Sequence, residues 1–349
     1  MRKTPQLLNL IQYQVEMSVY SNTTRVLNGT TLSYCSSPDN LPAEKIGKTF
    51  AYCLILIVSL VGNSFIGIIV YKTKTMRKSI NFMIVNMAMS DLLFPIFALP
   101  VILAELYTGS WLILGEALCK LVYFLQNIST AVSVQSLVLI TVDRFGAVVF
   151  PLRSPLISSK LCMVFISATW IVASVVFSPY LFALKLVDKR GDLTCALRWK
   201  ETFGESSSKV HFMLPVSAVF LYIPFALMLI LYCIIIITLK KKKLPGEQTP
   251  KAEKLHTKRN RNALKMAIAI VLGFAICWIP LSVFNVVYLF VWDTSTALPC
   301  DIMQYHYIAS FIARANCAVN PCICFTFSGN YRRGFKSLFN CPGGLRNSR

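Results

Sequence analysis

Residues 210–239 read VHFMLPVSAVFLYIPFALMLILYCIIIITL, and four lysines follow at 240–243. The stretch contains no Asp, Glu, Lys or Arg. About 20 apolar helical residues cross the hydrocarbon core of a bilayer, which is about 30 Å thick. Because lipid offers no hydrogen-bond partner to the backbone, such a segment must be a helix or part of a closed barrel. The run is continuous rather than alternating, so it predicts a membrane-spanning helix that ends at a basic cluster.

Six further stretches of this kind accompany the first one. The chain of 349 residues is 55% hydrophobic and 14% charged, which leaves too little polar surface to coat soluble domains. We therefore predict an all-α membrane protein, a seven-transmembrane helix bundle with a short amphipathic eighth helix at residues 331–339. The seven predicted spans are Phe50–Tyr71, Ile80–Ala104, Leu121–Val142, Leu161–Leu184, Val210–Leu239, Met266–Trp292 and Ile302–Phe327.

The distribution of charge between the spans predicts the direction of insertion. One set of loops and the tail carry 22 basic and 3 acidic residues, whereas the opposite set carries 12 basic and 11 acidic residues. The basic side is expected to be cytosolic, and basic residues that flank spans indicate a bilayer partner rather than nucleic acid. We thus expect a multi-pass plasma-membrane protein with residues 1–48 extracellular and glycosylated at Asn22 and Asn28, a membrane domain over 49–328, and a cytosolic helix and tail over 329–349.

Polar motifs follow one another through the spans in a specific order. They comprise Gly62-Asn63, Asn86-Met-Ala-Met-Ser-Asp91, Asp143-Arg144-Phe145, Trp170, Pro224 with Tyr232, Phe274-Ala-Ile-Cys-Trp278-Ile-Pro280, and Asn316 with Asn320-Pro321. Over most of its length the chain resembles the rhodopsin-like (class A) G-protein-coupled receptors, and it looks most similar to the neuropeptide receptors. This resemblance implies a receptor for an extracellular peptide that signals to a heterotrimeric G protein and binds arrestin, and it implies no enzymatic activity.

Asp91 is a carboxylate at the depth of the bilayer core, where an unpaired charge is costly. Asn63, Ser133, Asn316 and Asn320 can form a polar cage around it. The resemblance implies that this cluster holds an allosteric sodium ion, and otherwise no cofactor is expected. A hydrogen-bond network without an ion is the alternative.

Arg144 and Gln126 are 18 residues apart, or five helical turns, so one face of the third span runs from the outer pocket to the cytosol. The resemblance implies that Asp143, Arg144 and Tyr232 serve G-protein coupling. It also implies an activation core around the kink at Pro280, made of Val134, Pro224, Phe274, Trp278, Pro280 and Pro321. The chain departs from the family at Cys324, where tyrosine is usual, and at the base of the sixth span, where no acid is available to Arg144.

The ligand pocket is predicted by resemblance. Its expected residues are Tyr123, Gln126, Asn127, Trp278, Asn285, Tyr288, Tyr307, Phe311 and Arg314. Gln126 stands where amine receptors carry an aspartate, and Arg314 stands where opsins carry their lysine, which disfavours both ligand classes. A receptor for a small acidic or lipid ligand is the alternative, and a seven-span transporter is disfavoured because no internal repeat is found.

Arg314 is a permanent cation within a span and needs a partner. Tyr307 and Phe311 share its helical face, which we expect to line the ligand cavity. Two partners stay open: an internal carboxylate, Glu105 or Glu116, and an acidic group of the ligand.

The external cysteines suggest covalent ties between the helices and the loops. The resemblance implies a disulfide between Cys119 and Cys195, and Cys35 and Cys300 are the remaining external pair, predicted as a second bridge. The loop that carries Cys195 contains a predicted hairpin turn at Lys189-Arg190-Gly191-Asp192. Cys341, which follows the amphipathic segment, is a predicted palmitoylation site.

Overall fold

The computed structural model describes residues 25–27, 30–32, 42–108, 111, 115–150, 157–189, 192–241, 251–291 and 300–339. Within this part of the chain, seven helical spans are long and apolar enough to cross a membrane, as the sequence predicts. They are α2 (Pro42–Lys72), α3 (Ser79–Leu93) continued by η2 (Phe94–Ala98) and α4 (Leu99–Thr108), α5 (Gly115–Val149), α6 (Ser159–Phe177) with α7 (Pro179–Ala183), α9 (Lys209–Ser217) continued by η3 (Ala218–Tyr222) and α10 (Ile223–Lys241), α11 (Lys251–Val291), and α12 (Cys300–Phe327).

Most helices extend beyond the predicted spans; α11, for example, begins at Lys251 rather than at Met266. Two boundaries have an identifiable cause. α2 begins at Pro42, before the predicted start at Phe50, because the residues in between contain no break apart from Gly47. Leu184, predicted as the end of the fourth span, is instead the first residue of β3 (Leu184–Lys189). Hydropathy alone does not separate the last turn of an apolar helix from an apolar strand that follows it directly.

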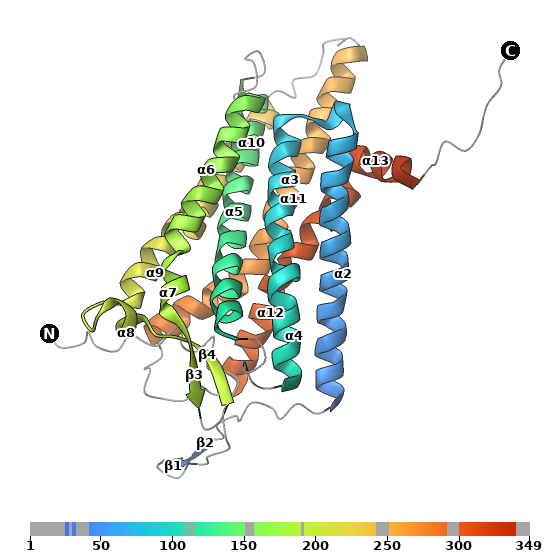
Figure 1. Cartoon of the computed structure of the whole chain (residues 1–349). Coiled ribbons are helices and arrows are strands. Elements are labelled where there is room, and N and C mark those ends of the chain that lie inside the picture. Colours follow the sequence, from blue (N-terminus) through green and yellow to red (C-terminus); the bar gives the residue numbers. More distant parts are fainter. Residues whose placement is uncertain are drawn as a thin grey trace.

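A β-hairpin lies at one end of the bundle (Figure 1). β3 pairs antiparallel with β4 (Asp192–Leu197), from Leu184↔Leu197 to Lys189↔Asp192, which is the pairing that the predicted hairpin requires. The disulfide between Cys119 and Cys195 ties this hairpin to the start of α5. Next to it lies α8 (Trp199–Phe203), and a second short hairpin joins β1 (Arg25–Leu27) to β2 (Thr30–Leu32).

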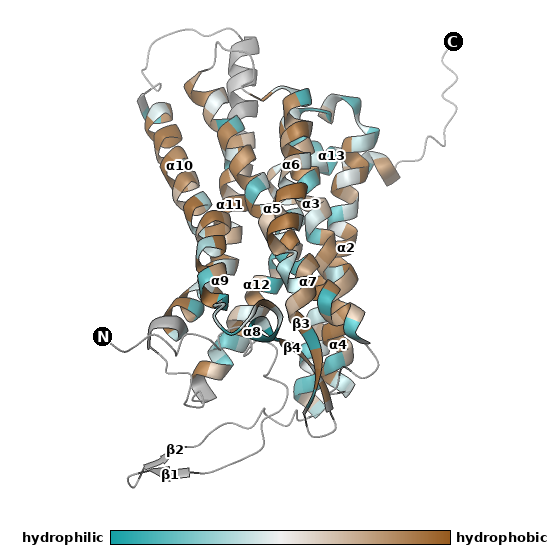
Figure 2. Ribbon diagram, turned by 60° about the vertical axis from the view of Figure 1, so that its left-hand side comes forward, coloured by the Kyte–Doolittle hydropathy of each residue, from teal (hydrophilic) through white to brown (hydrophobic). Residues whose placement is uncertain are grey.

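The outer face of the bundle is apolar. Hydrophobic residues colour the outward surfaces of the long helices in Figure 2. Ile171 on α6 is 64% exposed and Ile276 on α11 is 69% exposed. Large apolar side chains so widely exposed would be unfavourable in water, where contiguous apolar patches are rarely so large, but they suit contact with lipid.

α5 is the central helix of the bundle. It packs against α3, α6, α10 and α11, and fourteen of its residues are buried, from Cys119 to Gly146. Two spans contain a π-helical turn. One is η2, which contains Pro95, and the other is η3, which begins three residues after Pro215. Proline cannot donate the backbone hydrogen bond of a regular α-helix, which gives the wider turn at Pro95 a local cause.

α13 (Gly329–Phe339) is the predicted eighth helix, and it lies crosswise at the end of the bundle opposite the β3–β4 hairpin (Figure 1). Its Gly334 contacts Ile69 of α2 so closely that a Cβ there would lie 2.4 Å from Ile69 Cγ2. About two turns earlier in α2, a Cβ at Gly62 would lie 2.5 Å from Pro321 Cβ. The two glycines therefore allow α2 to approach α13 and α12.

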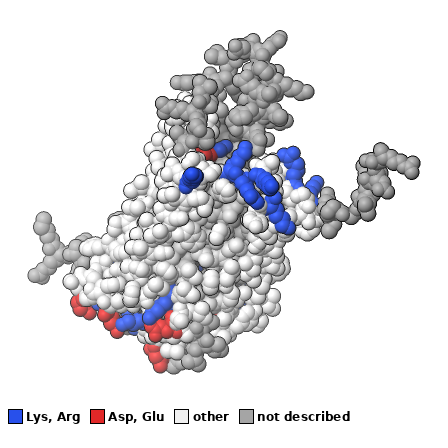
Figure 3. Space-filling view, turned by 45° about the horizontal axis from the view of Figure 1, so that its top comes forward, with Lys and Arg blue, Asp and Glu red and all other residues white. Residues whose placement is uncertain are grey.

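Charged side chains divide between the two ends (Figure 3). Basic side chains gather around the end that carries α13, where Arg332, Arg333 and Lys336 are exposed. Most acidic side chains visible in this view lie at the opposite end. The charge bias that predicts orientation is thus a property of the folded surface as well.

Candidate functional site

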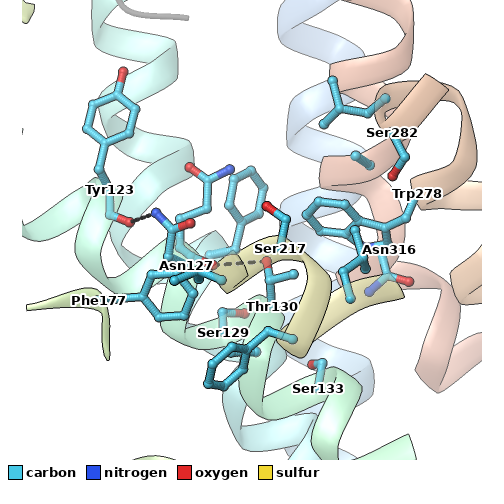
Figure 4. A pocket seen from close by; sticks show the side chains of 18 of the residues that line it. Tyr123, Asn127, Ser129, Thr130, Ser133, Phe177, Ser217, Trp278, Ser282 and Asn316 are labelled. Atoms are coloured by element: carbon cyan, nitrogen blue, oxygen red, sulfur yellow. Dashed lines mark hydrogen bonds between the residues drawn. The ribbon is translucent and has the colours of Figure 1, made fainter. Parts of the chain in front are cut away.

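A cavity of about 240 Å³ opens inside the bundle, and we call it the main cavity. Side chains of α5 face those of α11 and α12 across it (Figure 4). Six of the nine predicted pocket residues line it, namely Tyr123, Gln126, Asn127, Trp278, Asn285 and Arg314. Asn127 Nδ2 donates to the carbonyl of Tyr123 over 2.8 Å, which fixes its orientation on α5.

The other three predicted pocket residues contact protein instead of the cavity. Phe311 packs edge-on against Tyr52 of α2, with 5.3 Å between ring centroids. The ring of Tyr307 lies under the ammonium of Lys48, 4.5 Å away, and Tyr288 stacks on Phe284 at 5.7 Å. The face of α12 that carries Tyr307 and Phe311 therefore packs on α2, and only Arg314 of that face lines the cavity.

The sequence reasoning missed an aromatic wall of the cavity. It consists of Phe177 of α6, Tyr180 of α7, Phe212 of α9 and Phe220 of η3. Phe177 and Phe220 lie 5.7 Å apart and Tyr180 and Phe212 6.3 Å apart, measured between ring centroids. In the sequence, these aromatic residues look like ordinary core residues. The only signal that could have indicated a cavity wall was their position at the ends of two neighbouring spans.

The lower part of the cavity reaches the carboxylate of Asp91. Ser133 Oγ donates to Asp91 Oδ1 over 2.8 Å, and Asn320 Nδ2 donates to Asp91 Oδ2 over 2.7 Å. Ser90 Oγ lies 2.9 Å from Ser133 Oγ, and Asn63 Nδ2 donates to the carbonyl of Cys317 over 2.9 Å. The predicted cluster is thus brought together from α2, α3, α5 and α12.

Three amide oxygens in this cluster are buried and have no hydrogen-bond partner among the described residues: Asn63 Oδ1, Asn316 Oδ1 and Asn320 Oδ1. Buried acceptors without a donor are costly, and they are ordinarily satisfied by water or a cation. Together with the Asp91 carboxylate they form a set of oxygen donors suited to a hard cation. The residues present therefore fit a sodium ion.

Aromatic packing connects the cavity floor to the core of the bundle. Trp278 of α11 stacks on Phe274, one turn away, with 5.7 Å between centroids and 17° between the ring planes. Phe274 is fully buried and contacts Phe225 of α10 at 5.5 Å. Val134 is fully buried in the same hydrophobic cluster, so the structure brings Val134, Phe274 and Trp278 of the predicted activation core together beside Pro280 of α11.

The end of α5 nearer α13 carries the predicted coupling residues Asp143 and Arg144. Arg144 Nε donates to Asp143 Oδ2 over 3.1 Å, and the guanidinium forms a second, shorter contact with the same oxygen. Thr141 Oγ1 donates to Tyr232 Oη over 3.4 Å, which joins α5 to α10. The base of α11, residues 258–261, is helical, but its side chains lie outside the described part.

Cys324, where the family usually has tyrosine, is fully buried in the half of the bundle nearer α13. A tyrosine hydroxyl does occur nearby on α13, because Tyr331 is 1% exposed and donates to Asn81 Oδ1 over 3.5 Å. Burial raises the pKa of Tyr331 well above its ordinary value, so the hydroxyl stays protonated.

Neither predicted internal carboxylate pairs with Arg314. Arg314 Nη1 donates to Tyr52 Oη over 3.1 Å, and no carboxylate of the described residues lies within 4 Å of the guanidinium. Glu105 accepts from Trp111 Nε1 over 3.1 Å, and Glu116 pairs with Lys120 at 2.6 Å. A direct ion pair is therefore not formed, because Glu105 bonds to Trp111 and Glu116 to Lys120. Glu105 nevertheless lies near enough to Arg314 for the two charges to attract each other.

Several predicted covalent sites lie outside the described residues or side chains. The disulfide between Cys119 and Cys195 is present. The predicted second bridge of Cys35 with Cys300, the glycosylation sites Asn22 and Asn28, and Cys341 cannot be placed and stay predictions.

Comparison with known proteins agrees with this architecture. A family model described as "7 transmembrane receptor (rhodopsin family)" matches residues 62–323. The chain is 29% identical to the QRFP-like peptide receptor of Branchiostoma floridae, over 87% of this chain and 80% of that protein. It is 27% identical to the RYamide receptor of Drosophila melanogaster, over 93% and 70%, and 30% identical to the neuropeptide Y receptor type 2 of Homo sapiens, over 83% and 75%.

Proposed function

The chain belongs to the rhodopsin family of seven-transmembrane receptors, and we propose that it binds an extracellular peptide and in response activates a heterotrimeric G protein. The observation that carries this proposal is the extent of the main cavity. It is lined near its outer end by Tyr123 and Asn285, and at its floor by Asp91 and Trp278. A ligand in this cavity contacts the tryptophan that stacks on Phe274, and movement there is passed to the core of the bundle.

A peptide is favoured as the ligand by the relatives and by the form of the cavity. The relatives named above are receptors for peptides, one of them named for an amide. The cavity volume of about 240 Å³ lies below the range of about 300–1,000 Å³ that holds a whole drug-sized ligand. It suits the end of a peptide whose remainder contacts the outer loops, including the β3–β4 hairpin.

The end of the bundle with α13 is proposed to face the cytosol. The excess of basic residues on that side supports this orientation, which places the amino terminus outside. Arg144 would then stand at the cytosolic mouth, held at rest by Asp143 and available to a G protein and to arrestin when the bundle opens.

Sodium is proposed as an allosteric ion at Asp91. The three unpartnered amide oxygens support it, because a cation would satisfy them. Ser133 and Asn320 already hold both carboxylate oxygens, so the cage is preformed. The chemistry that sodium supplies is charge neutralisation.

A peptide screen tests the proposal. Cells that express the receptor are exposed to a library of synthetic peptides, and calcium and cyclic nucleotide levels are recorded together. We expect peptides that activate the wild type and fail with the Arg144→Ala variant at equal surface expression. The proposal is wrong if only non-peptide ligands activate the receptor, or if the responses to peptides do not depend on Arg144.

A further inference from the structure

Arg314 is the cation of the main cavity. Among the described residues that line this cavity, only Arg314 and Asp91 carry a charge. Both oxygens of Asp91 accept hydrogen bonds, from Ser133 and Asn320. Asp91 belongs to the proposed sodium site, so Arg314 is the other charged group of this lining. Glu105 interacts with it electrostatically but bonds to Trp111, which leaves the guanidinium accessible to a ligand.

The guanidinium has one hydrogen-bond partner within the described part of the chain, the hydroxyl of Tyr52 at 3.1 Å. A guanidinium has five N–H donors in a rigid, planar arrangement, and it remains charged at any physiological pH. Tyr52 is 2% exposed and packs against Phe311, so it holds one edge of the guanidinium in place. Most of the donors stay available to a group within the cavity.

A second donor in the same cavity is also unsatisfied. Trp278 Nε1 is buried and has no hydrogen-bond partner among the described residues. The cavity therefore presents unmatched donors on α11 and on α12. A ligand group that supplies several acceptor oxygens and a negative charge would satisfy them.

We propose that the main cavity binds a carboxylate of the activating peptide, and that Arg314 is the residue that binds it, with Tyr52 as the positioning residue. The inference rests on the proposed peptide receptor function. Arginine binds a carboxylate through two parallel N–H···O bonds, which makes this contact both strong and directional. The carboxylate is either the free carboxyl terminus of the peptide or an Asp or Glu side chain close to its end.

The test uses two matched libraries of synthetic peptides with the same sequences, one with free carboxyl termini and one with carboxyl-terminal amides, together with a panel of small carboxylic acids. We expect activators that lose potency by about tenfold to a hundredfold when their carboxylate is neutralised. The Arg314→Gln variant should lose the same factor and respond equally to acid and neutral forms. Lys120→Gln, which removes an external cation that does not line the cavity, is the matched control and should keep the wild-type discrimination.

The two peptide libraries and the small acids distinguish where the carboxylate comes from. They also distinguish failure of the carboxylate site from failure of the proposed peptide function. Activators from the free-acid library identify the carboxyl terminus, and amidated activators that lose activity on Asp→Asn or Glu→Gln exchange identify a side chain. If small acids alone activate the receptor through Arg314, the peptide function is wrong and the carboxylate site stands. If neutralised and acidic peptides act alike on the wild type, the carboxylate site is wrong and the peptide function stands.

Thermal stability of the purified, ligand-free receptor gives a readout that requires no agonist. An arginine that awaits a ligand contributes little to the resting fold, so Arg314→Gln should melt within a few degrees of the wild type or above it. A structural arginine would instead lower the melting temperature markedly when removed, and that result overturns the inference. Tyr52→Phe should retain expression and weaken the acidic agonist less than Arg314→Gln does.

Discussion

Asn320 on α12 donates a hydrogen bond of 2.7 Å from Nδ2 to Asp91 Oδ2 on α3. The bond joins two residues that are 229 positions apart in sequence, and it leaves the other amide atom, Asn320 Oδ1, buried without a partner in the described part. One amide therefore closes the cage around Asp91 and offers an oxygen to its interior.

Sodium should stabilise the receptor through this cage. An ion that binds only the folded state adds about 1.4 kcal/mol at a concentration ten times its Kd. We expect a higher melting temperature in NaCl than in N-methylglucamine chloride for the wild type, and no difference for Asp91→Asn. Glu116→Gln, which neutralises an exposed carboxylate, serves as the control and should respond like the wild type. Equal melting of the wild type in both salts would argue for a purely hydrogen-bonded cluster.

Arg144→Ala should abolish G-protein signalling and leave peptide binding intact. Arg144 lies at the end of α5 opposite the main cavity and contacts Asp143, not a residue of the cavity lining. Binding is measured with a radiolabelled activator from the screen and signalling by nucleotide exchange, both at matched surface expression. Phe145→Tyr, which restores the residue common in the family, should signal normally. Full signalling by Arg144→Ala would refute the coupling role.

Gly62→Ala should destabilise the bundle. The added Cβ would lie 2.5 Å from Pro321 Cβ, so α2 or α12 must shift, at a cost of about 1–3 kcal/mol. Gly67 lies on the same helix, and a Cβ there meets no atom within 4 Å, so Gly67→Ala should be neutral or slightly stabilising. Melting temperature and surface expression report the difference, and equal behaviour of the two variants would count against the close contact.

Loss of the disulfide between Cys119 and Cys195 should cost about 2–5 kcal/mol, the usual range for a native bridge. The double Cys119→Ser/Cys195→Ser variant is expected to melt earlier and to bind the activating peptide weakly, since the hairpin is no longer held to α5. Cys233→Ser, which removes an exposed free cysteine, should behave like the wild type. Peptide mapping without reduction should recover the linked pair, and two free thiols in folded receptor would exclude the bridge.

The spans and the polar cluster were predictable because a lipid environment permits few backbone structures and few environments for a charged side chain. A run such as residues 210–239 without charge has one stable form in a bilayer, and Asp91 requires polar neighbours wherever it is buried. The residues that satisfy Asp91 could be named because they recur at helical spacing and in the order of the family motifs.

The partners of Arg314 could not be predicted in the same way. Helical spacing places Tyr307, Phe311 and Arg314 on one face, but it does not tell which part of that face meets a neighbouring helix. The packing of Tyr52 on Phe311 decides this, and Tyr52 carries no sequence signal that separates it from Tyr71, the other tyrosine of α2. The aromatic wall at Phe177 and Phe220 was missed for the same reason.

The π-helical turn at Phe94–Ala98 alters how this receptor should be aligned with others. A turn closed by i→i+5 bonds takes up one more residue than an α-helical turn, which rotates everything beyond it by about 100°. The side chain of Glu105 therefore points where that of an adjacent residue would point in an uninterrupted α-helix. In this orientation it accepts the hydrogen bond from Trp111. A gap-free alignment with a relative that lacks this turn would pair residues of different orientation from Leu99 to Thr108, although the two sequences have equal length there.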